Sequence, residues 1–222
     1  MRMTQVRRFS AVRRHGARCA LVICIISSAA GCAVESDGLA VSDGPASGER
    51  SPIVNEAIRQ TDSKGAPLPF QTEFPNRWND NNSGTAYEPC TAVGARLLAG
   101  FSLDPGSVRD AALADGQTVR GCRWAFVGRT GGVSQYLGNS TSLDEYKRKQ
   151  AAHVEWLPDQ NVLGRRVGVS KVSSINGCSV HVQSGAAGIT TEFIFTTDPP
   201  PISEICSKAI EFTRATIDQM PL

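Results

Sequence analysis

The sequence predicts an α+β fold, in which an antiparallel sheet of five or six strands is flanked by an N-terminal and a C-terminal helix and carries two disulfides. Apolar residues recur at helical spacing over 89–101 and 202–217, whereas between these segments they alternate with polar residues. Short turns such as Ile175-Asn176-Gly177 separate the alternating segments and favour antiparallel pairing. The order helix, strands, helix is typical of α+β domains.

The first helix is predicted from Pro89 to about Gly100. Proline is favoured at the start of a helix, where its missing N–H costs no hydrogen bond, and glycine is favoured at the end. The apolar positions recur every three or four residues, at Val93, Leu97, Leu98 and Phe101.

Six segments are predicted as strands. The clearest is 120–127, because Cys122, Trp124 and Phe126 occupy alternate positions and therefore share the core face, while Arg123 points to the other face. The other five segments are 132–137, 153–157, 166–172, 178–183 and 189–196.

The outward face of the predicted sheet is polar. Strand parity places Arg123, Ser179, His181 and Glu192 on this face. Their inward neighbours are Cys178, Val180, Val182, Ile189, Phe193 and Phe195. We expect His181, like His153, to be exposed to solvent, and we regard this face as a candidate contact surface.

Two further helices complete the prediction. Ser142 and Glu145 fit a capping box, which predicts a short helix ending near Ala152. After a run of prolines, one apolar stripe predicts the terminal helix. The stripe consists of Ile202, Ile205, Cys206, Ala209, Ile210, Thr213 and Ile217.

Residues 1–31 are predicted to be a lipoprotein signal peptide. Six arginines precede an apolar run of 12 residues, Cys19 to Ala30, whereas a membrane-spanning helix needs about 20. Ala29-Ala30-Gly31-Cys32 resembles a bacterial lipobox, so we expect acylation of Cys32 and a location on the extracytoplasmic face of the cell membrane. A retained membrane anchor is the alternative, and the export route stays open.

Charge excludes a basic nucleic-acid-binding surface. Six of the 23 basic residues lie in the first 31 residues, which contain no acid, so 17 basic residues face 21 acidic ones in the remainder. Nucleic-acid-binding domains carry clustered positive charge, and this net-negative remainder does not.

The remaining five cysteines form an odd set in an exported chain. Acylation of Cys32 leaves Cys90, Cys122, Cys178 and Cys206 for two disulfides. Of the three possible pairings we favour Cys122–Cys178, between neighbouring strands, and Cys90–Cys206, between the two helices. A zinc site is disfavoured because no Cys-x-x-Cys spacing occurs and because Cys178 and His181 point to opposite faces of a strand. We expect no metal and no other cofactor.

Residues 32–69 are predicted to be a flexible tether and 70–222 a globular domain that begins with an extended arm. The segment from Ala33 to about Ala86 is rich in Ser, Gly, Pro, Asp and Asn. A flexible tether of roughly 50 residues with this composition has a root-mean-square reach on the order of 40 Å. Phe70, Phe74 and Trp78 are expected to pack on the domain. The alternative is a segment that recognises a partner.

The cysteine motifs resemble those of a known family. The motifs are Glu88-Pro89-Cys90, Arg120-Gly121-Cys122-Arg123-Trp124, Gly164-Arg165-Arg166-Val167, Cys178-Ser179-Val180, and Cys206 in a terminal helix that ends at Met220-Pro221. Over residues 70–222 the chain resembles a family of actinobacterial cell-envelope lipoproteins that carry a domain of unknown function. The resemblance implies an acylated, exported, disulfide-linked α+β domain, and it brings no catalytic or binding residues.

Two function classes stay open. The first is a membrane-tethered module that binds an envelope protein, a glycan or a lipid ligand without catalysis. The second is an envelope hydrolase or transferase with an unrecognised site. The sequence has no G-x-S-x-G, S-x-x-K or phosphate-binding glycine motif, which favours the first class and predicts that the protein is not an enzyme.

Overall fold

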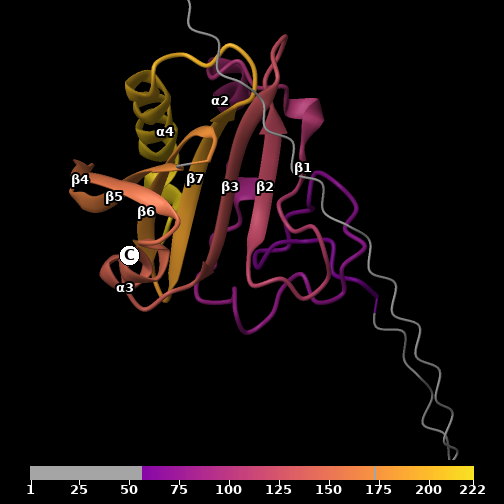
Figure 1. Cartoon of the computed structure of the whole chain (residues 1–222). Helices are drawn as coiled ribbons and strands as arrows, with labels where there is room; N and C mark the ends of the chain where they lie inside the picture. Colours follow the sequence, from indigo (N-terminus) through magenta and orange to yellow (C-terminus); the bar gives the residue numbers. More distant parts are fainter. Residues whose placement is uncertain (1–56, 173) are drawn as a thin grey trace, which may run out of the picture. The chain divides into compact units, whose positions relative to one another are not determined.

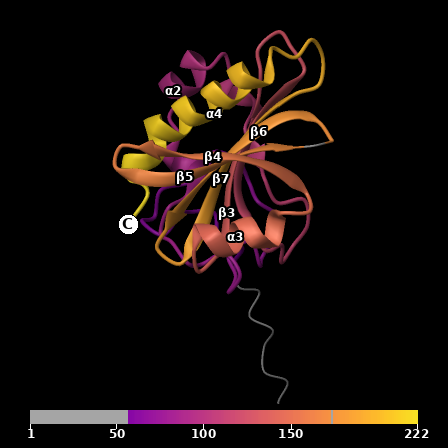
Figure 2. The same cartoon turned by 60° about the vertical axis from the view of Figure 1, so that its left-hand side comes forward.

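A seven-stranded antiparallel sheet forms the centre of the fold, in the order β1-β2-β3-β7-β6-β5-β4 (Figures 1 and 2). The computed structural model describes residues 57–172 and 174–222, so the predicted signal peptide, Cys32 and residues 32–56 of the predicted tether lie outside the described residues. The strands are β1 (Arg109–Asp110), β2 (Arg120–Ala125), β3 (Gly131–Asn139), β4 (Val154–Val162), β5 (Arg165–Val172), β6 (Asn176–Ser184) and β7 (Ala187–Phe195). The helices are α1 (Pro89–Ala92), α2 (Ala95–Gly100), α3 (Leu143–Gln150) and α4 (Ile202–Thr216), with short 3-10 turns at Pro105–Ser107 and Ile217–Gln219.

The predicted antiparallel sheet is confirmed, with one strand more than expected. All six predicted segments are strands, and every pair in the sheet is antiparallel. The additional strand, β1, has only two residues, which is too short for alternation to reveal. β4 extends past Pro158 because it is an edge strand, and its pairing with β5 shifts register between Leu157 and Gln160.

The predicted N-terminal helix is wrong as a continuous element. It is divided into α1 and α2, because Val93 ends α1 in an extended conformation, with φ −88° and ψ 104°. The Ser142 cap is confirmed: its side chain accepts a hydrogen bond from the Glu145 N–H at the start of α3.

The predicted stripe of α4 faces the core. Ile205, Cys206, Ala209 and Thr213 are buried, and Phe212 and Thr216 are buried in addition, whereas Ile202 is exposed. Phe212 is fully buried and packs with Phe101, Trp124 and Phe193. These contacts join α4 to β2 and β7 through one aromatic cluster.

The predicted disulfide pairing is wrong, although the four cysteines do form two disulfides. The bonds are Cys90–Cys122 and Cys178–Cys206, with Cα–Cα distances of 5.2 and 5.1 Å. The predicted Cys122–Cys178 bond needs β2 and β6 to be neighbours, but β3 and β7 lie between them. Adjacent strands lie about 4.8 Å apart, so the two strand cysteines are too far from each other. Each instead bonds to the helix that packs on its own part of the sheet.

The arm packs on the domain, as predicted. Leu68 is buried, and Phe70 and Trp78 are partly buried against the core. Thr61 forms a β-bridge with Pro67, so residues 57–69, which the prediction assigns to the tether, belong to the folded unit.

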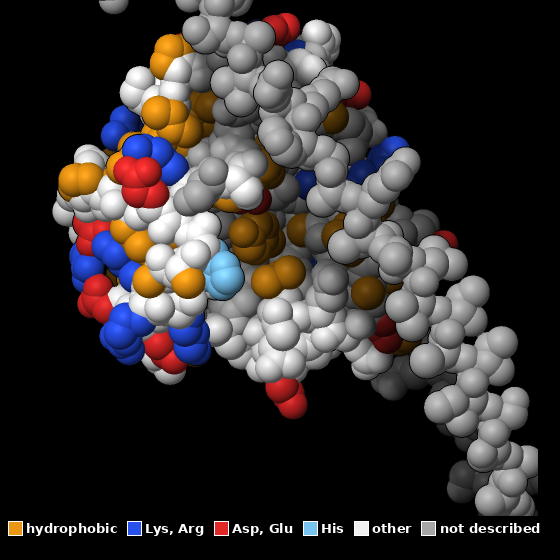
Figure 3. Space-filling model, viewed as in Figure 1, with side chains coloured by type: hydrophobic (Ala, Val, Ile, Leu, Met, Phe, Trp, Pro, Cys, Tyr) orange, Lys and Arg blue, Asp and Glu red, His pale blue; other side chains and the backbone are white. Residues whose placement is uncertain are grey.

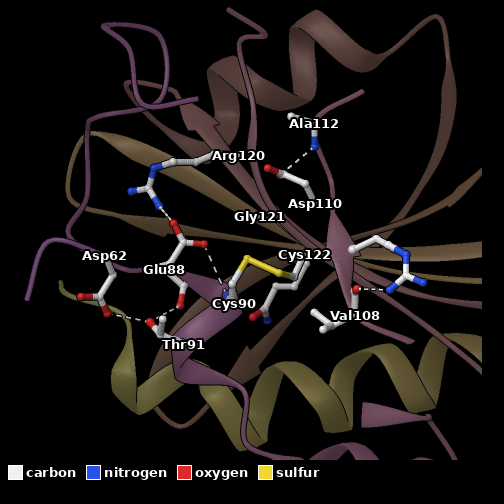
Figure 4. Close-up of a disulfide and its surroundings, with 12 residues drawn as sticks. Asp62, Glu88, Cys90, Thr91, Val108, Asp110, Ala112, Arg120, Gly121 and Cys122 are labelled. Atoms are coloured by element: carbon white, nitrogen blue, oxygen red, sulfur yellow. Dashed lines mark hydrogen bonds and ion pairs between the residues drawn. A yellow bond between two sulfur atoms is a disulfide. The ribbon is translucent and has the colours of Figure 1, made fainter. Parts of the chain in front are cut away.

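A buried ion-pair cluster holds the arm beside the first disulfide. The Arg77 side chain is fully buried and donates to Glu88 Oε2 at 2.9 Å and to Asp110 Oδ2 at 2.8 Å. Arg120 donates to the same Glu88 oxygen at 2.8 Å. Figure 4 shows Glu88, Arg120 and Asp110 around the Cys90–Cys122 bond. Two guanidinium groups and two carboxylates balance in charge, which limits the cost of burying them.

Candidate functional site: the open face of the sheet

The sheet has two unlike faces. α4 packs on one face, where it is bonded to β6 through Cys178. We call the opposite face the open face. α3 packs over its β5 and β6 part, and a recess lies beside it, as Figure 3 shows from this side. Hydrophobic side chains lie in the recess, while Lys, Arg, Asp and Glu gather over α3 and the strands near it.

Strand register places a polar row across the open face. Arg123 of β2 lies opposite Ser134 of β3, Ser134 lies opposite Glu192 of β7, and Glu192 lies opposite Ser179 of β6. Directly opposite residues of antiparallel strands point to the same face. The prediction that Arg123, Ser179, His181 and Glu192 share a face is therefore confirmed.

The predicted exposure of this face is wrong for two of these residues. Ser179 and His181 are buried, at 3% and 5% exposure, because α3 and the β4 edge fold over this part of the sheet. The His181 ring lies 4.8 Å from the Tyr146 ring and 5.1 Å from the Trp156 ring, between centroids. Gly168 makes this packing possible, since a Cβ there would lie 3.0 Å from both Leu143 and Trp156 atoms. His153 is exposed, as predicted.

His181 joins two hydroxyl groups into one chain. Its Nε2 lies 3.0 Å from Ser170 Oγ and its Nδ1 lies 2.9 Å from Thr190 Oγ1. Burial, with a smaller effect from Lys147, lowers the pKa of His181 to about 3, so the ring is neutral near pH 7. Ser170 was not singled out from the sequence. It alternates along β5 with Val167 and Val169, which face the core, and this alternation would have placed it on the open face.

Glu192 lies at the middle of the open face and is half-buried. Burial raises its pKa, and the Ser179 hydroxyl donates to Glu192 Oε1 at 3.3 Å. Within residues 57–172 and 174–222, no Lys, Arg or His nitrogen lies within ion-pair distance of this carboxylate. The middle of the face therefore carries a carboxylate without a counter-charge from the described residues.

A cavity of about 470 Å³ with a largely polar lining lies at one end of the open face. Ligand sites commonly have volumes of roughly 300–1,000 Å³. Tyr136, Tyr146 and Thr190 line this cavity. Further polar lining residues are Asp80, Asn81, Thr118, Asn139, Lys149 and Gln150. Burial raises the pKa of both tyrosines, so their hydroxyls stay protonated and can donate hydrogen bonds. Neither tyrosine was singled out from the sequence.

A second cavity, of about 320 Å³, lies on the β1–β2–β3–β7 part of the open face. Ala125, Gly132 and Ile194 give it an apolar floor, and Trp124 and Val133 also line it although their side chains belong to the core. Its other lining residues are Ser107, Arg109, Arg123, Gly131 and Ser134. The polar row borders this cavity, since Arg123 and Ser134 line it, and the polar cavity lies on the other side of the row, because Ser134 and Tyr136 are alternate residues of β3.

The aromatic arm is held against the domain. The Trp78 ring has the Arg59 and Arg77 guanidinium carbons 4.4 and 4.5 Å from its centroid. Arg77 also lies 5.7 Å from the Phe70 centroid, and Phe74 is half-buried. The arm's aromatic residues therefore contribute to packing.

Of the cysteines and histidines that could bind zinc, Cys178 and His181 lie closest together in the sequence. Cys178 is bonded to Cys206 on the core side, while His181 points to the open face, so the two side chains diverge. In the described part of the chain, no three His, Cys, Asp or Glu side chains gather in a way that could hold a metal ion.

Comparisons with known proteins identify only the family. Among the described residues, no helix is both long and apolar enough to span a membrane. No curated protein and no solved structure matches the chain. The family described as "Protein of unknown function (DUF3558)" matches residues 28–219. This span includes both disulfides and every strand of the sheet, and the chain therefore belongs to the DUF3558 family of proteins of unknown function.

Proposed function

We propose that this protein is a membrane-tethered, extracytoplasmic lipoprotein that binds a ligand or partner through the open face and does not catalyse a reaction. The short apolar run before Cys32 and the lipobox-like residues support acylation of Cys32. The pairing of the other four cysteines in two disulfides supports an oxidising compartment.

The pair of cavities on one face is the observation that supports binding. One cavity is polar and the other has an apolar floor, and both lie on a sheet that two disulfides and α4 hold rigid. A preformed concave site on rigid strands loses little conformational entropy when a ligand binds. Glu192, a half-buried carboxylate between the cavities, gives the face a polar group that a ligand can satisfy.

A blocking substitution tests this proposal. Ser134→Trp places an indole in the cavity with the apolar floor, whereas Ser203→Trp places one on the exposed side of α4. Small molecules and partners extracted with each protein are identified by mass spectrometry. We expect the native chain and Ser203→Trp to retain the same bound species and Ser134→Trp to lose it. Equal retention by both variants contradicts binding at the open face.

A second substitution tests the anchor. Cys32→Ala removes the acylated sulfur, so the protein should move from the detergent phase to the aqueous phase in phase partition. Cys24→Ala, within the predicted signal peptide, is the matched control and should leave the partition unchanged. Retention of Cys32→Ala in the detergent phase contradicts the anchor.

The Ser170–His181–Thr190 chain favours a second candidate, an envelope hydrolase or transferase. A neutral imidazole that accepts from a serine hydroxyl can act as a general base. Ser170 is fully buried and His181 nearly so, which leaves a substrate carbonyl no access in this conformation. Labelling by a serine-directed probe that Ser170→Ala abolishes would establish this candidate, and we expect no labelling.

A further inference from the structure

Two arginines face each other at the edge of the open face. Arg109 of β1 and Arg123 of β2 are directly opposite partners in the antiparallel pair, and both side chains line the same cavity. Like charges in this position repel each other and destabilise the strand pair. A favourable role for this pair therefore needs an anion that both side chains can contact.

The protein itself supplies no such anion from the described residues. Within residues 57–172 and 174–222, neither arginine has a carboxylate within 4 Å. Asp110, next to Arg109, is paired with Arg77. Glu192 lies two strands away from Arg123 in the polar row, about 10 Å at the usual strand spacing. Both residues are exposed, and Arg109 Nη1 donates to the Val108 carbonyl oxygen at 2.7 Å, which leaves the other N–H groups of Arg109 for a ligand.

The surface beside the arginines is apolar. The cavity floor is formed by Ala125 of β2, Gly132 of β3 and Ile194 of β7, which lie directly opposite one another on the open face. Position 132 of the floor has no room for a side chain, since a Cβ there would lie 2.0 Å from the Trp124 carbonyl oxygen. A pair of cations at one side of an apolar hollow is complementary to a molecule with an anionic head and an alkyl chain.

We propose that this cavity binds an amphipathic anion, a carboxylate or phosphate monoester that carries an alkyl chain. The anionic group lies between Arg109 and Arg123, whose planar guanidinium groups can each donate two parallel hydrogen bonds to it. The chain lies on the apolar floor and gains the free energy of leaving water. This inference rests on the proposed function and names the class of its ligand.

The test measures binding of dodecanoate below its micellar concentration to the full chain carrying Cys32→Ala, which needs no detergent. Calorimetry gives the Kd. We expect dodecanoate to bind, dodecyl phosphate to compete with it, and dodecanol to bind at least tenfold more weakly.

Two double variants locate the site. Arg109→Gln/Arg123→Gln should raise the Kd for dodecanoate at least tenfold, whereas Arg96→Gln/Arg214→Gln, which removes the same charge from exposed helix positions, should change it less than twofold. Equal effects of the two double variants, or equal affinity for dodecanol, overturn the proposal. Binding to phosphatidylglycerol vesicles without binding of dissolved dodecanoate also overturns it, because the site then recognises a membrane surface.

The experiments separate this inference from the proposed function. If the native chain retains a bound species that Ser134→Trp loses, but dodecanoate does not bind, the amphipathic anion is wrong and the open face is still a binding site. If dodecanoate binds and Arg109→Gln/Arg123→Gln weakens it, both proposals are supported.

Discussion

Arg77 and Glu88 form a two-pronged ion pair in the interior of the domain, with Nη1 to Oε2 at 2.9 Å and Nη2 to Oε1 at 3.1 Å. Burial and hydrogen bonding to Glu88 act on Arg77 in opposite directions, and the net effect raises its pKa, so the guanidinium stays charged. The pair fixes the arm to α1, because Glu88 is the residue that caps that helix.

Arg77→Met should lower the free energy of unfolding by about 3–5 kcal/mol. The substitution removes a positive charge that neutralises the buried carboxylate of Glu88 and the partly buried one of Asp110. Removing one partner of a buried ion pair has a cost of this size, because the other charge stays buried without its partner. Urea denaturation followed by circular dichroism measures the change. Arg96→Met, at an exposed position of α2, should stay within about 0.5 kcal/mol. Similar losses for the two variants would contradict a structural role for the cluster.

Replacing both Cys178 and Cys206 by Ser should lower the free energy of unfolding by about 3–4 kcal/mol, less any strain in the native bond. The two cysteines are 28 residues apart, and the loop-entropy relation gives this range for a loop of that length. Thermal unfolding of the oxidised variant and native proteins gives the difference. Non-reducing peptide mapping should find Cys178 joined to Cys206, and a Cys122–Cys178 peptide would contradict the strand order.

Acidification should weaken the fold through His181. Its pKa is about 3 in the folded protein and near 6.5 in the unfolded chain, so between these values the unfolded chain binds a proton that the folded protein does not. The contribution of His181 to the free energy of unfolding is fully present above about pH 6.5, and it is lost as the pH falls toward 3. Denaturation midpoints from pH 7 to pH 4 measure this slope.

His181→Gln is the comparison for the pH series, because it keeps a polar group and removes the titration. The variant should show a smaller loss of stability on acidification than the native protein. Glu192 acts in the opposite direction, since its pKa is raised in the folded protein, and it contributes equally to both chains. Parallel pH profiles for the two proteins would show that His181 is not buried as a neutral ring.

Phe212→Ala should cost about 3–5 kcal/mol of unfolding free energy. The side chain is fully buried between α4 and the sheet, and its removal leaves a cavity as well as losing apolar burial. Leu113→Ala, at a 68% exposed position, should change stability by less than about 0.5 kcal/mol. Chemical denaturation of both variants gives the comparison.

Local patterns in the sequence predict most of the sheet but not its order. Alternation identifies β2, β6 and β7 and places Arg123 and Glu192 on one face, because parity depends only on neighbours along the chain. The neighbours of β2 depend on contacts far apart in the sequence, and the disulfide prediction was wrong for this reason. The burial of His181 depends on α3 folding over it, which no period in the sequence reveals.

The candidate site was predictable only in part. The polar face follows from strand parity, but the opposition of Arg109 and Arg123 depends on a two-residue strand and on its register with β2. Tyr136 and Tyr146 belong to different elements, and only the fold brings them to one cavity. The division of the N-terminal helix at Val93 likewise depends on packing, since its apolar spacing continues through the break.

The two disulfides close separate stretches of chain, 90–122 and 178–206, that do not overlap. A cut inside either stretch leaves the pieces covalently joined, whereas a cut between 123 and 177 divides the protein into two fragments. Cleavage between α3 and β4 would leave β1, β2 and β3 in one fragment and β4 to β7 with α4 in the other. Each fragment would keep its own cross-link, and β3 and β7 would supply the edges along which the halves could reassemble as a split protein.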